Sequence, residues 1–244
     1  MSESYYTIAQ FYDDFTSNVD YEKRAAFLDR RLCRFGSRGI VLDAGCGTGT
    51  LLNMLGKAGY DMIGVDDSEQ MLDVARKKNP DALLLMQDLC ELDLYGTVQG
   101  AICMQDTLNH LENVDQFRTA LRRISLFMES GSYFIFDMNT EYKHRVLLGE
   151  NTYVYESDQA YCVWQNELSE DGNTVYENLE VFTDAGNGLY ARESETIEEI
   201  LLDDAAVEKV LSETGFETME KLDGDSYEEL TAESERIVYV VRKK

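Results

Sequence analysis

The stretch Val41-Leu42-Asp43-Ala44-Gly45-Cys46-Gly47-Thr48-Gly49-Thr50 carries the pattern that decides the fold. An apolar run over Gly39–Gly45 predicts a buried strand, and the alternate glycines at its end lead into a predicted helix over Thr48–Lys57. Glycine at such a bend lets the backbone approach a ligand where a Cβ atom would collide. The sequence therefore predicts a strand, a ligand-binding loop and a helix in succession.

The spacing of these glycines separates two kinds of ligand. The dinucleotide fingerprint is G-x-G-x-x-G, but Thr50 stands where the third glycine would have to be. The pattern is instead D-x-G-x-G-x-G, with the carboxyl group of Asp43 two residues before Gly45. A carboxylate repels a pyrophosphate, whereas it attracts a ligand that carries an amino group and a positively charged sulfur. The spacing favours the second kind.

Strands and helices alternate beyond this loop. Further apolar strands are predicted at 61–68, 82–88, 99–104 and 131–139, and helices at 69–78 and 114–128. Strands that are apolar throughout and separated by helices indicate a parallel sheet covered on both faces. Right-handed crossovers make this a doubly wound α/β domain. Two amphipathic helices, around Ile8–Phe15 and Tyr21–Phe35, are predicted ahead of it.

The pattern changes after Asn139. From Thr152 to Glu199 residues alternate between apolar and polar, and Gly172-Asn173 and Gly186-Asn187-Gly188 are typical of hairpin turns. We therefore expect a four-stranded antiparallel sheet here, inserted into the α/β domain as a lid.

The α/β pattern resumes with a predicted helix over Asp204–Thr214 and strands near 216–221 and 236–242, which brings the mostly parallel sheet to seven strands. The predicted organisation is one α/β domain made of residues 1–140 and 201–244. Residues 141–200 form the inserted sheet, which serves as a lid, as the acceptor side of the site or as a dimer face.

Acidic residues end the second and third strands. Asp66 follows Gly45 by 21 residues, the place where an acid accepts the hydroxyl protons of a ribose, and Asp88 ends the next strand. Because the carboxyl ends of parallel strands meet at one edge, Asp43, Asp66 and Asp88 are expected in one crevice. Each acid taken singly is more simply a helix cap or a solvated loop residue; together with the glycines they indicate a ligand site.

With these motifs the sequence resembles the class I S-adenosylmethionine (SAM)-dependent methyltransferases, most closely over Ile40–Asn139. The resemblance implies SAM as cofactor and S-adenosylhomocysteine (SAH) as product. It implies that the methionine end lies on the glycine loop and the ribose on Asp66, while Asp88 and the Leu89 backbone meet the adenine. The cofactor-binding residues implied in this way are Tyr21, Asp43, Gly45, Cys46, Gly47, Asp66, Asp67, Met71, Asp88, Leu89 and Met104. Asp67 departs from the family, which usually has an apolar residue beside the adenine.

The chain also resembles a bacterial branch of small-molecule methyltransferases that includes the nucleotide-amino-sugar N-methyltransferases. The matching features are Tyr12-Asp13 with Asp20-Tyr21 near the N-terminus, the run Asp106-x-x-Asn109-His110-Leu111, and the inserted sheet. In that branch an N-terminal tyrosine closes over the methyl donor, which makes Tyr12 a candidate.

His110 is the first candidate for a catalytic base, and Tyr12 is the second. The simpler structural interpretations are a packed or capping histidine and an aromatic on a buried helix face. Asp106, Asn109 and Trp164 are candidates for contact with the acceptor, although Asp106 could cap a helix and Trp164 could anchor the inserted sheet. The acidic run Glu193–Glu199 is most simply a solvated edge.

Composition limits the partners. Twenty-two Lys and Arg stand against 47 Asp and Glu, a formal net charge of −25, so nucleic acid and anionic membranes are poor partners. Five cysteines without a C-x-x-C pair and two histidines predict reduced thiols, a cytoplasmic location and no metal site. The abundant tyrosines of the insert suggest a homodimer face or a lid.

These observations predict an enzyme that transfers a methyl group from SAM to nitrogen or oxygen of a small-molecule acceptor. A nicotinamide-dependent (NAD(P)) Rossmann oxidoreductase shares the glycine loop and the ribose acid, but the glycine spacing and the acids at Asp43 and Asp88 disfavour it. A non-catalytic SAM-binding module is the third possibility. The sequence does not identify the acceptor.

Overall fold

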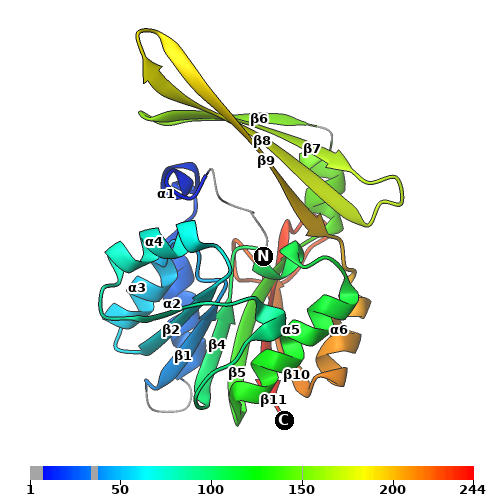
Figure 1. Cartoon of the computed structure of the whole chain (residues 1–244). Coiled ribbons are helices and arrows are strands. Elements are labelled where there is room, and N and C mark those ends of the chain that lie inside the picture. Colours follow the sequence, from blue (N-terminus) through cyan, green and yellow to red (C-terminus); the bar gives the residue numbers. More distant parts are fainter. Residues whose placement is uncertain (1–7, 34–37, 150) are drawn as a thin grey trace.

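The computed structural model describes residues 8–33, 38–149 and 151–244. Its main element is a sheet of seven strands in the order β10-β11-β5-β4-β1-β2-β3 (Figure 1). The strands are β1 (Ile40–Ala44), β2 (Asp61–Asp66), β3 (Leu83–Met86), β4 (Val98–Cys103), β5 (Met128–Asn139), β10 (Phe216–Asp223) and β11 (Arg236–Lys243). Strand β11 runs antiparallel to both neighbours and the other pairings are parallel, which confirms the predicted doubly wound, mostly parallel sheet.

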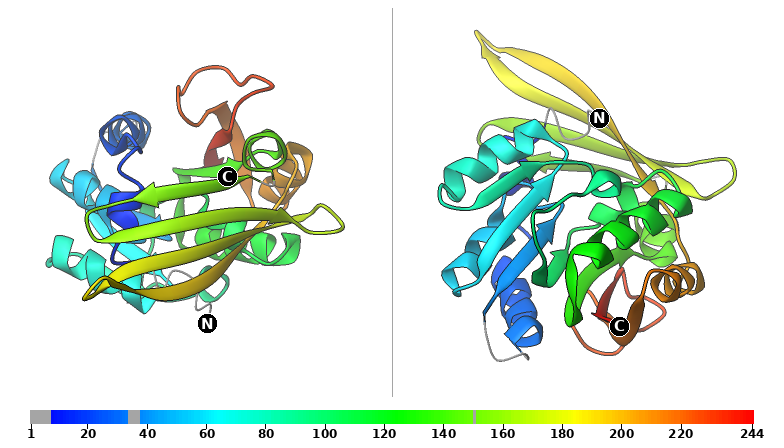
Figure 2. Two further views of the ribbon diagram at one scale, coloured as in Figure 1. Left: turned by 90° about the horizontal axis from the view of Figure 1, so that it is seen from above. Right: turned by 60° about the horizontal axis from the view of Figure 1, so that its bottom comes forward.

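Helices cover both faces of this sheet. They are α2 (Tyr21–Leu32), α3 (Thr50–Lys57) and α4 (Glu69–Lys78) on one face, and α5 (Val114–Phe127) and α6 (Asp204–Glu213) on the other (Figure 2). Each face has its own apolar core: Phe27, Leu52 and Leu72 lie in the first, and Phe117 and Leu211 in the second. The strands are apolar throughout because both of their faces are buried.

Polar side chains begin these helices where the sequence changes period. Ser68 accepts a hydrogen bond from the Met71 N–H at the start of α4, and Asn113 and Asp203 cap α5 and α6 in the same way. The helix after the glycine loop begins at Thr50, not at the predicted Thr48. Gly49 has φ +75°, a left-handed conformation that no α-helix contains.

The other differences from the predicted helices are short. Only Tyr12–Phe15 (α1) of the expected helix at Ile8–Phe15 is helical, and α2 ends at Leu32; residues 34–35 lie outside the described residues. His110 belongs to a 3₁₀ turn, η3 (Thr107–His110), ahead of α5. The β3–β4 connection contains only the 3₁₀ turn η2 (Leu89–Glu91), where a full helix would cover the sheet.

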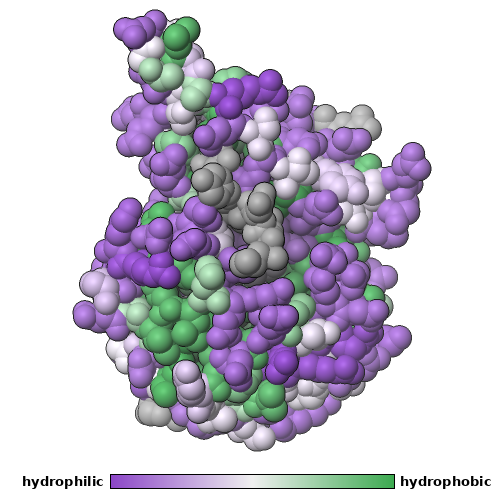
Figure 3. Space-filling model, in the orientation of Figure 1, coloured by the Kyte–Doolittle hydropathy of each residue, from purple (hydrophilic) through white to green (hydrophobic). Residues whose placement is uncertain are grey.

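One face of the edge strand β3 is therefore poorly covered. Leu83 is 49% exposed, and Ile63 and Leu85 on the same side are half-buried. The space-filling view shows an apolar area on this side of the molecule (Figure 3).

The second sheet is antiparallel, with the order β6-β7-β8-β9. Its strands are β6 (Thr152–Glu156), β7 (Ala160–Leu168), β8 (Thr174–Gly186) and β9 (Leu189–Ile200), and the π-helix η4 (Lys143–Leu148) connects β5 to it. The predicted inserted sheet and its two hairpin turns are confirmed. Because β5 ends at the carboxyl edge of the large sheet, the insert emerges over that edge and covers it (Figures 1 and 2).

The segment Ile8–Phe15, which ends in α1, packs against the inserted sheet. Ile8 and Phe11 pack with Cys162, Leu179 and Ile197 in a third apolar cluster, which lies under the inserted sheet. Among the described residues, no helix is long and apolar enough to cross a membrane.

Candidate active site

Two cavities lie between the sheets. The first, here called the glycine-loop pocket, has a volume of ≈ 530 Å³ and is lined by the glycine loop and by the carboxyl ends of β2, β3 and β4. All the residues expected to bind a cofactor line it: Tyr21, Asp43, Gly45, Cys46, Gly47, Asp66, Asp67, Met71, Asp88, Leu89 and Met104. The sequence motifs therefore converge on one cavity at the edge where ligands bind in doubly wound folds.

The glycine loop needs its glycines for conformation and for space. Gly45 has φ +76°, and a Cβ atom on it would lie 2.2 Å from Cγ2 of Thr107. The Gly45 N–H donates to the Val65 carbonyl at 2.7 Å, which holds the bend against β2. Gly47 has φ +52°, with open space where its Cβ would lie, and its N–H donates to Oδ2 of Asp66 at 2.8 Å. The loop therefore presents bare backbone to the pocket.

Asp43 is a buried carboxyl whose charge is not satisfied. Its side chain is 3% exposed, and Oδ2 has no hydrogen-bond partner among the described residues. Burial, together with the nearby charge of Asp66, raises the pKa of Asp43 to about 7. A ligand ammonium group placed here would supply the missing partner, so this residue fits the amino group of a methionine moiety.

Asp66 is better satisfied. Its two oxygens accept the N–H groups of Gly47 at 2.8 Å and Ser68 at 3.0 Å, but burial still raises its pKa to about 6. Asp88 accepts the Cys90 N–H at 2.7 Å and so also caps η2. Burial and the charge of Asp88 raise the pKa of Asp67. Asp43, Asp66 and Asp88 thus line one pocket, as their positions at strand ends predicted, and Asp67 lines it with them.

The second cavity, here called the inter-sheet chamber, has a volume of ≈ 510 Å³ and lies between α1, the inserted sheet and the ends of β4 and β11. Trp164 and Tyr155 form an aromatic wall, with ring centroids 5.9 Å apart. Asp106, Lys143 and Arg236 supply charged groups to the same lining. Trp164 thus belongs to a cavity wall and also packs within the inserted sheet.

The glycine-loop pocket and the inter-sheet chamber share two residues, Tyr12 and Gln105. Gln105 and Asp106 have φ values of +62° and +55°, which non-glycine residues seldom adopt. The carboxylate of Asp137 accepts both of their N–H groups, at 3.2 and 2.8 Å. Strained backbone of this kind costs about 1–3 kcal/mol per residue and persists only where its surroundings hold it. Asp137 therefore holds the turn that separates the two cavities.

Asp137 belongs to a buried ion-pair network. Arg236 contacts Oδ1 of Asp137 at 3.1 Å and Oδ2 of Asp106 at 2.5 Å, and Arg24 contacts Asp137 at 3.5 Å. Burial alone would raise the pKa of Asp106, but Arg236 and Lys143 outweigh it and hold that pKa well below its usual range. The suggestion that Asp106 caps a helix is wrong, because its side chain makes no cap hydrogen bond.

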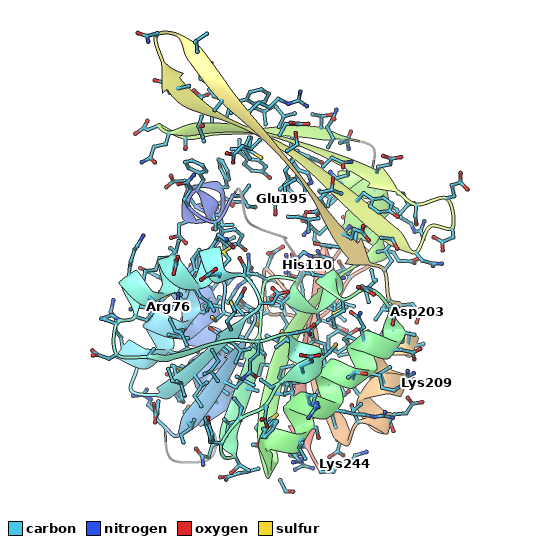
Figure 4. All side chains as sticks on the ribbon, viewed as in Figure 1. Arg76, His110, Glu195, Asp203, Lys209 and Lys244 are labelled. Atoms are coloured by element: carbon cyan, nitrogen blue, oxygen red, sulfur yellow. The ribbon has the colours of Figure 1, made fainter. Side chains whose placement is uncertain are left out.

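His110 lies at the upper end of the large sheet, facing the inserted sheet (Figure 4). Nδ1 lies 3.4 Å from the Glu198 carbonyl oxygen, which only accepts hydrogen bonds, and Nε2 lies 3.8 Å from Oδ1 of Asp106. Ligand atoms of Asp106, His110 and Glu199 lie within 4.8 Å of one another, as in a metal site. The cations Arg236 and Lys143 already neutralise Asp106, and they would oppose a metal ion there.

Two expectations about polar residues need correction. Asn109 is fully buried and lines neither cavity; its amide donates to the Ile200 carbonyl at 3.0 Å and accepts the Asn139 N–H at 3.1 Å. It therefore ties β9 to β5 and does not contact an acceptor. Glu199 is not part of a solvated edge, because it is 2% exposed and lies 3.0 Å from Nε2 of His144. Glu198 is exposed because successive side chains of β9 point to opposite faces of the sheet, which puts Glu199 on the covered face with Ile197.

Tyr12 lies where the two cavities meet. Burial and the charges of Tyr21 and Asp106 raise its pKa well above the ordinary value. Its hydroxyl therefore stays protonated, which makes Tyr12 a poor base. The neighbouring Asp13 accepts a hydrogen bond from Thr48 Oγ1 at 2.7 Å and pairs with Lys78, so α1 is fastened over the glycine loop.

The residues that sequence reasoning missed come from distant segments. They are Gln105, Asp137, Glu177, Arg24 and Arg236. Gln105 could have been predicted as a site residue, because it closely follows the predicted strand at 99–104. Nothing in the sequence links the other four, because separate elements contribute them.

The fold and the glycine-loop pocket are those of a class I methyltransferase. Comparison with known proteins agrees: residues 41–131 match the family described as "Methyltransferase domain". A crystal structure of an S-adenosylmethionine-dependent methyltransferase from Clostridium acetobutylicum superposes with a TM-score of 0.87, at 28% identity and 98% coverage of both chains.

Two sequence relatives extend the comparison. A provisionally assigned methyltransferase of Geobacillus is 26% identical over 98% of this chain and 100% of its own length. The dTDP-3-amino-3,6-dideoxy-alpha-D-glucopyranose N,N-dimethyltransferase of Streptomyces fradiae is 31% identical, over 48% of each chain. The protein is a class I SAM-dependent methyltransferase, with SAM as its cofactor, and the oxidoreductase alternative is wrong.

Proposed function

We propose that this enzyme transfers the methyl group of SAM to a nitrogen or oxygen atom of a small molecule bound in the inter-sheet chamber. The observation that carries the proposal is that the glycine-loop pocket and the chamber meet at Tyr12 and Gln105. A chamber of ≈ 510 Å³ suits a small molecule. The Streptomyces fradiae relative, whose name gives a sugar nucleotide as acceptor, supports the same class.

The residues of the glycine-loop pocket would divide the cofactor between them. The unpartnered carboxyl oxygen of Asp43 suits the amino group of the methionine moiety, and Asp66 suits the ribose hydroxyls. Met71 and Met104 would flank the adenine, near Asp88 and the Leu89 N–H. SAM supplies a methyl group that its sulfonium sulfur already activates for in-line displacement.

The chain itself must then position the acceptor, exclude water and handle one proton. Helix α1 covers the site and carries Tyr12, whose protonated hydroxyl can orient the reacting groups. With the Nδ1 proton donated to the Glu198 carbonyl, Nε2 of His110, which lines the glycine-loop pocket, would accept a proton from a hydroxyl group of the acceptor that extends into that pocket. The ionised carboxylate of Asp106 would stabilise the imidazolium that forms.

The test combines binding with turnover. Calorimetry should show binding of SAM and SAH but not of NAD, and release of SAH should follow addition of amines or hydroxyl compounds from an acceptor panel. With a hydroxyl acceptor, His110→Gln should lower kcat by about 100-fold with little change in the Kd for SAM. Tight SAM binding without turnover on any acceptor would favour the non-catalytic module, and an unchanged kcat would remove His110 from its role.

A further inference from the structure

One buried carboxyl in the inter-sheet chamber has no hydrogen-bond or ion-pair partner among the described residues. Glu177 on β8 is 9% exposed and lines the chamber. Its carboxyl group makes no hydrogen bond and no ion pair within 4 Å to the described residues. A carboxylate this deeply buried is poorly solvated by water, so a cation placed in the chamber would stabilise it.

The charges around Glu177 are unevenly balanced. Four carboxyl groups and three permanent cations lie close together at this end of the chamber. The carboxyl groups are those of Asp106, Asp137, Glu177 and Glu199, and the cations are Arg24, Lys143 and Arg236. Arg236 and Arg24 pair with Asp137, and Arg236 and Lys143 pair with Asp106. Glu199 has His144 at 3.0 Å and the Asn139 amide at 2.8 Å. Of these four carboxyl groups, only that of Glu177 has no ion-pair or hydrogen-bond partner among the described residues.

The surroundings of Glu177 also point to a ligand. Antiparallel pairing puts Glu177 opposite Asn166, and two pairs further along the same strands, on the same face of the sheet, Leu179 lies opposite Trp164. Both side-chain polar atoms of Asn166 and the Nε1 atom of Trp164 are buried and lack hydrogen-bond partners among the described residues. An aromatic face beside a buried carboxylate is a favourable place for an organic cation. Burial and the negative charges of Glu199 and Asp106 raise the pKa of Glu177 well above its ordinary value, so a cationic ligand would relieve an existing repulsion.

We propose that Glu177 selects the acceptor: its carboxylate binds the ammonium group of a small-molecule amine against the ring faces of Trp164 and Tyr155, and takes up one of its protons before the nitrogen lone pair attacks the methyl group. This inference rests on the proposed function, because it takes the inter-sheet chamber as the acceptor site. Glu177 is a specificity-determining residue in this scheme, and the recognised chemistry is that of a primary or secondary amine, not a neutral hydroxyl compound.

Trp164 provides a direct readout, because it is the only tryptophan of the chain and lines the chamber. SAH-loaded protein is titrated with benzylammonium and with benzyl alcohol, two probes of similar shape that differ in charge, and the change in Trp164 fluorescence is followed. We expect benzylammonium to bind at least about tenfold more tightly, and Glu177→Gln to reduce that preference to less than about threefold.

The matched control is Glu167→Gln, which removes an exposed carboxyl from the adjacent strand β7 and should keep the full preference. Glu177→Gln is close in shape and removes an unpaired buried charge, so its Tm should be equal to or above that of the native protein. Equal binding of the two probes, no binding of benzylammonium, or a preference that survives Glu177→Gln would each overturn the inference.

Calorimetry with SAH separates this inference from the proposed function. If SAH fails to bind to the native protein, the proposed function fails. If SAH binds and the probes are not distinguished, only the role of Glu177 fails. Loss of SAH binding in Glu177→Gln alone would also contradict the inference, because the residue would then act on the cofactor side.

Discussion

The glycine-loop pocket and the inter-sheet chamber both contain buried carboxyl groups, but they differ in whether cationic side chains pair with these groups. In the glycine-loop pocket Asp43 has an unpaired oxygen, and burial together with the charge of Asp66 raises its pKa to about 7; it forms no ion pair with the described residues. In the chamber Asp106 and Asp137 are paired with arginine and lysine, and the pKa of Asp106 is lowered. A cationic ligand is therefore needed to neutralise Asp43 in the glycine-loop pocket. In the chamber, side chains of the protein already neutralise Asp106 and Asp137.

This difference predicts that removing a charge has opposite effects on stability in the two regions. A buried pair that loses one partner leaves an uncompensated charge, whereas a lone buried charge destabilises the empty protein until it is removed. Variants in each region test this contrast.

The largest effect is expected in the chamber, from Arg236→Leu. This change leaves Asp106 and Asp137 without their main cation and should lower the free energy of unfolding by about 3–5 kcal/mol. Urea denaturation followed by circular dichroism measures it. Arg242→Leu on the same strand β11 removes a half-exposed pair with Glu217 and should cost less than about 1 kcal/mol. If the two variants lower the free energy of unfolding by similar amounts, the buried ion pairs of Arg236 stabilise the fold no more than an exposed pair does.

The next effect concerns Asp43→Asn in the glycine-loop pocket. SAM should bind about 100-fold more weakly, because the ammonium group loses its carboxylate. The folded pKa of Asp43 lies above the unfolded value, so ionised Asp43 destabilises the empty protein increasingly as pH rises from about 4 to about 7. Calorimetry and thermal unfolding of the apo protein should therefore show weaker SAM binding together with a higher Tm at about pH 8.

The pH profile provides the control for Asp43→Asn. Near pH 4 the native side chain is protonated, so the gain in Tm should vanish there. SAM affinity of the native protein should fall about tenfold between about pH 8 and pH 6, as Asp43 and then Asp66 take up protons. The decrease should be smaller in the variant. A lower Tm at every pH would show that Asp43 is paired in the folded protein, contrary to the comparison.

The smallest effect is expected at Asp13, which links α1 to the glycine loop. Asp13→Asn weakens the contacts with Thr48 and Lys78, and because Asp13 is exposed the change should raise the Kd for SAM only about two- to fivefold. Asp14→Asn in the same helix, also exposed, is the control and should leave the Kd unchanged. No difference between the variants would mean that α1 covers the pocket without help from Asp13.

The same two regions differ in how far the sequence predicted them. The glycine-loop pocket is built from one continuous loop and from residues that directly follow strands, so strand order and glycine spacing were sufficient to find Asp43, Gly45 and Asp66. The chamber was predicted only in outline. Trp164 was found because it is the sole tryptophan, but Glu177 was missed and Asn109 was assigned to the wrong role.

The reason lies in the geometry of the inserted sheet. Alternation along a strand shows that successive side chains face opposite ways, but it does not show which face another part of the chain will cover. Glu198 and Glu199 follow one another in the same acidic run, and only contact with His144 and Asn139 makes the second a buried residue.

By itself the amino-acid sequence determined the doubly wound sheet, the inserted antiparallel sheet and the cavity at the glycine loop, because period, turn chemistry and spacing act over a few neighbouring residues. Only the tertiary structure decided which acids are paired. Arg24, Asp137, Glu177 and Arg236 come from four distant elements, and their charges interact because folding brings them into one space from which water is excluded.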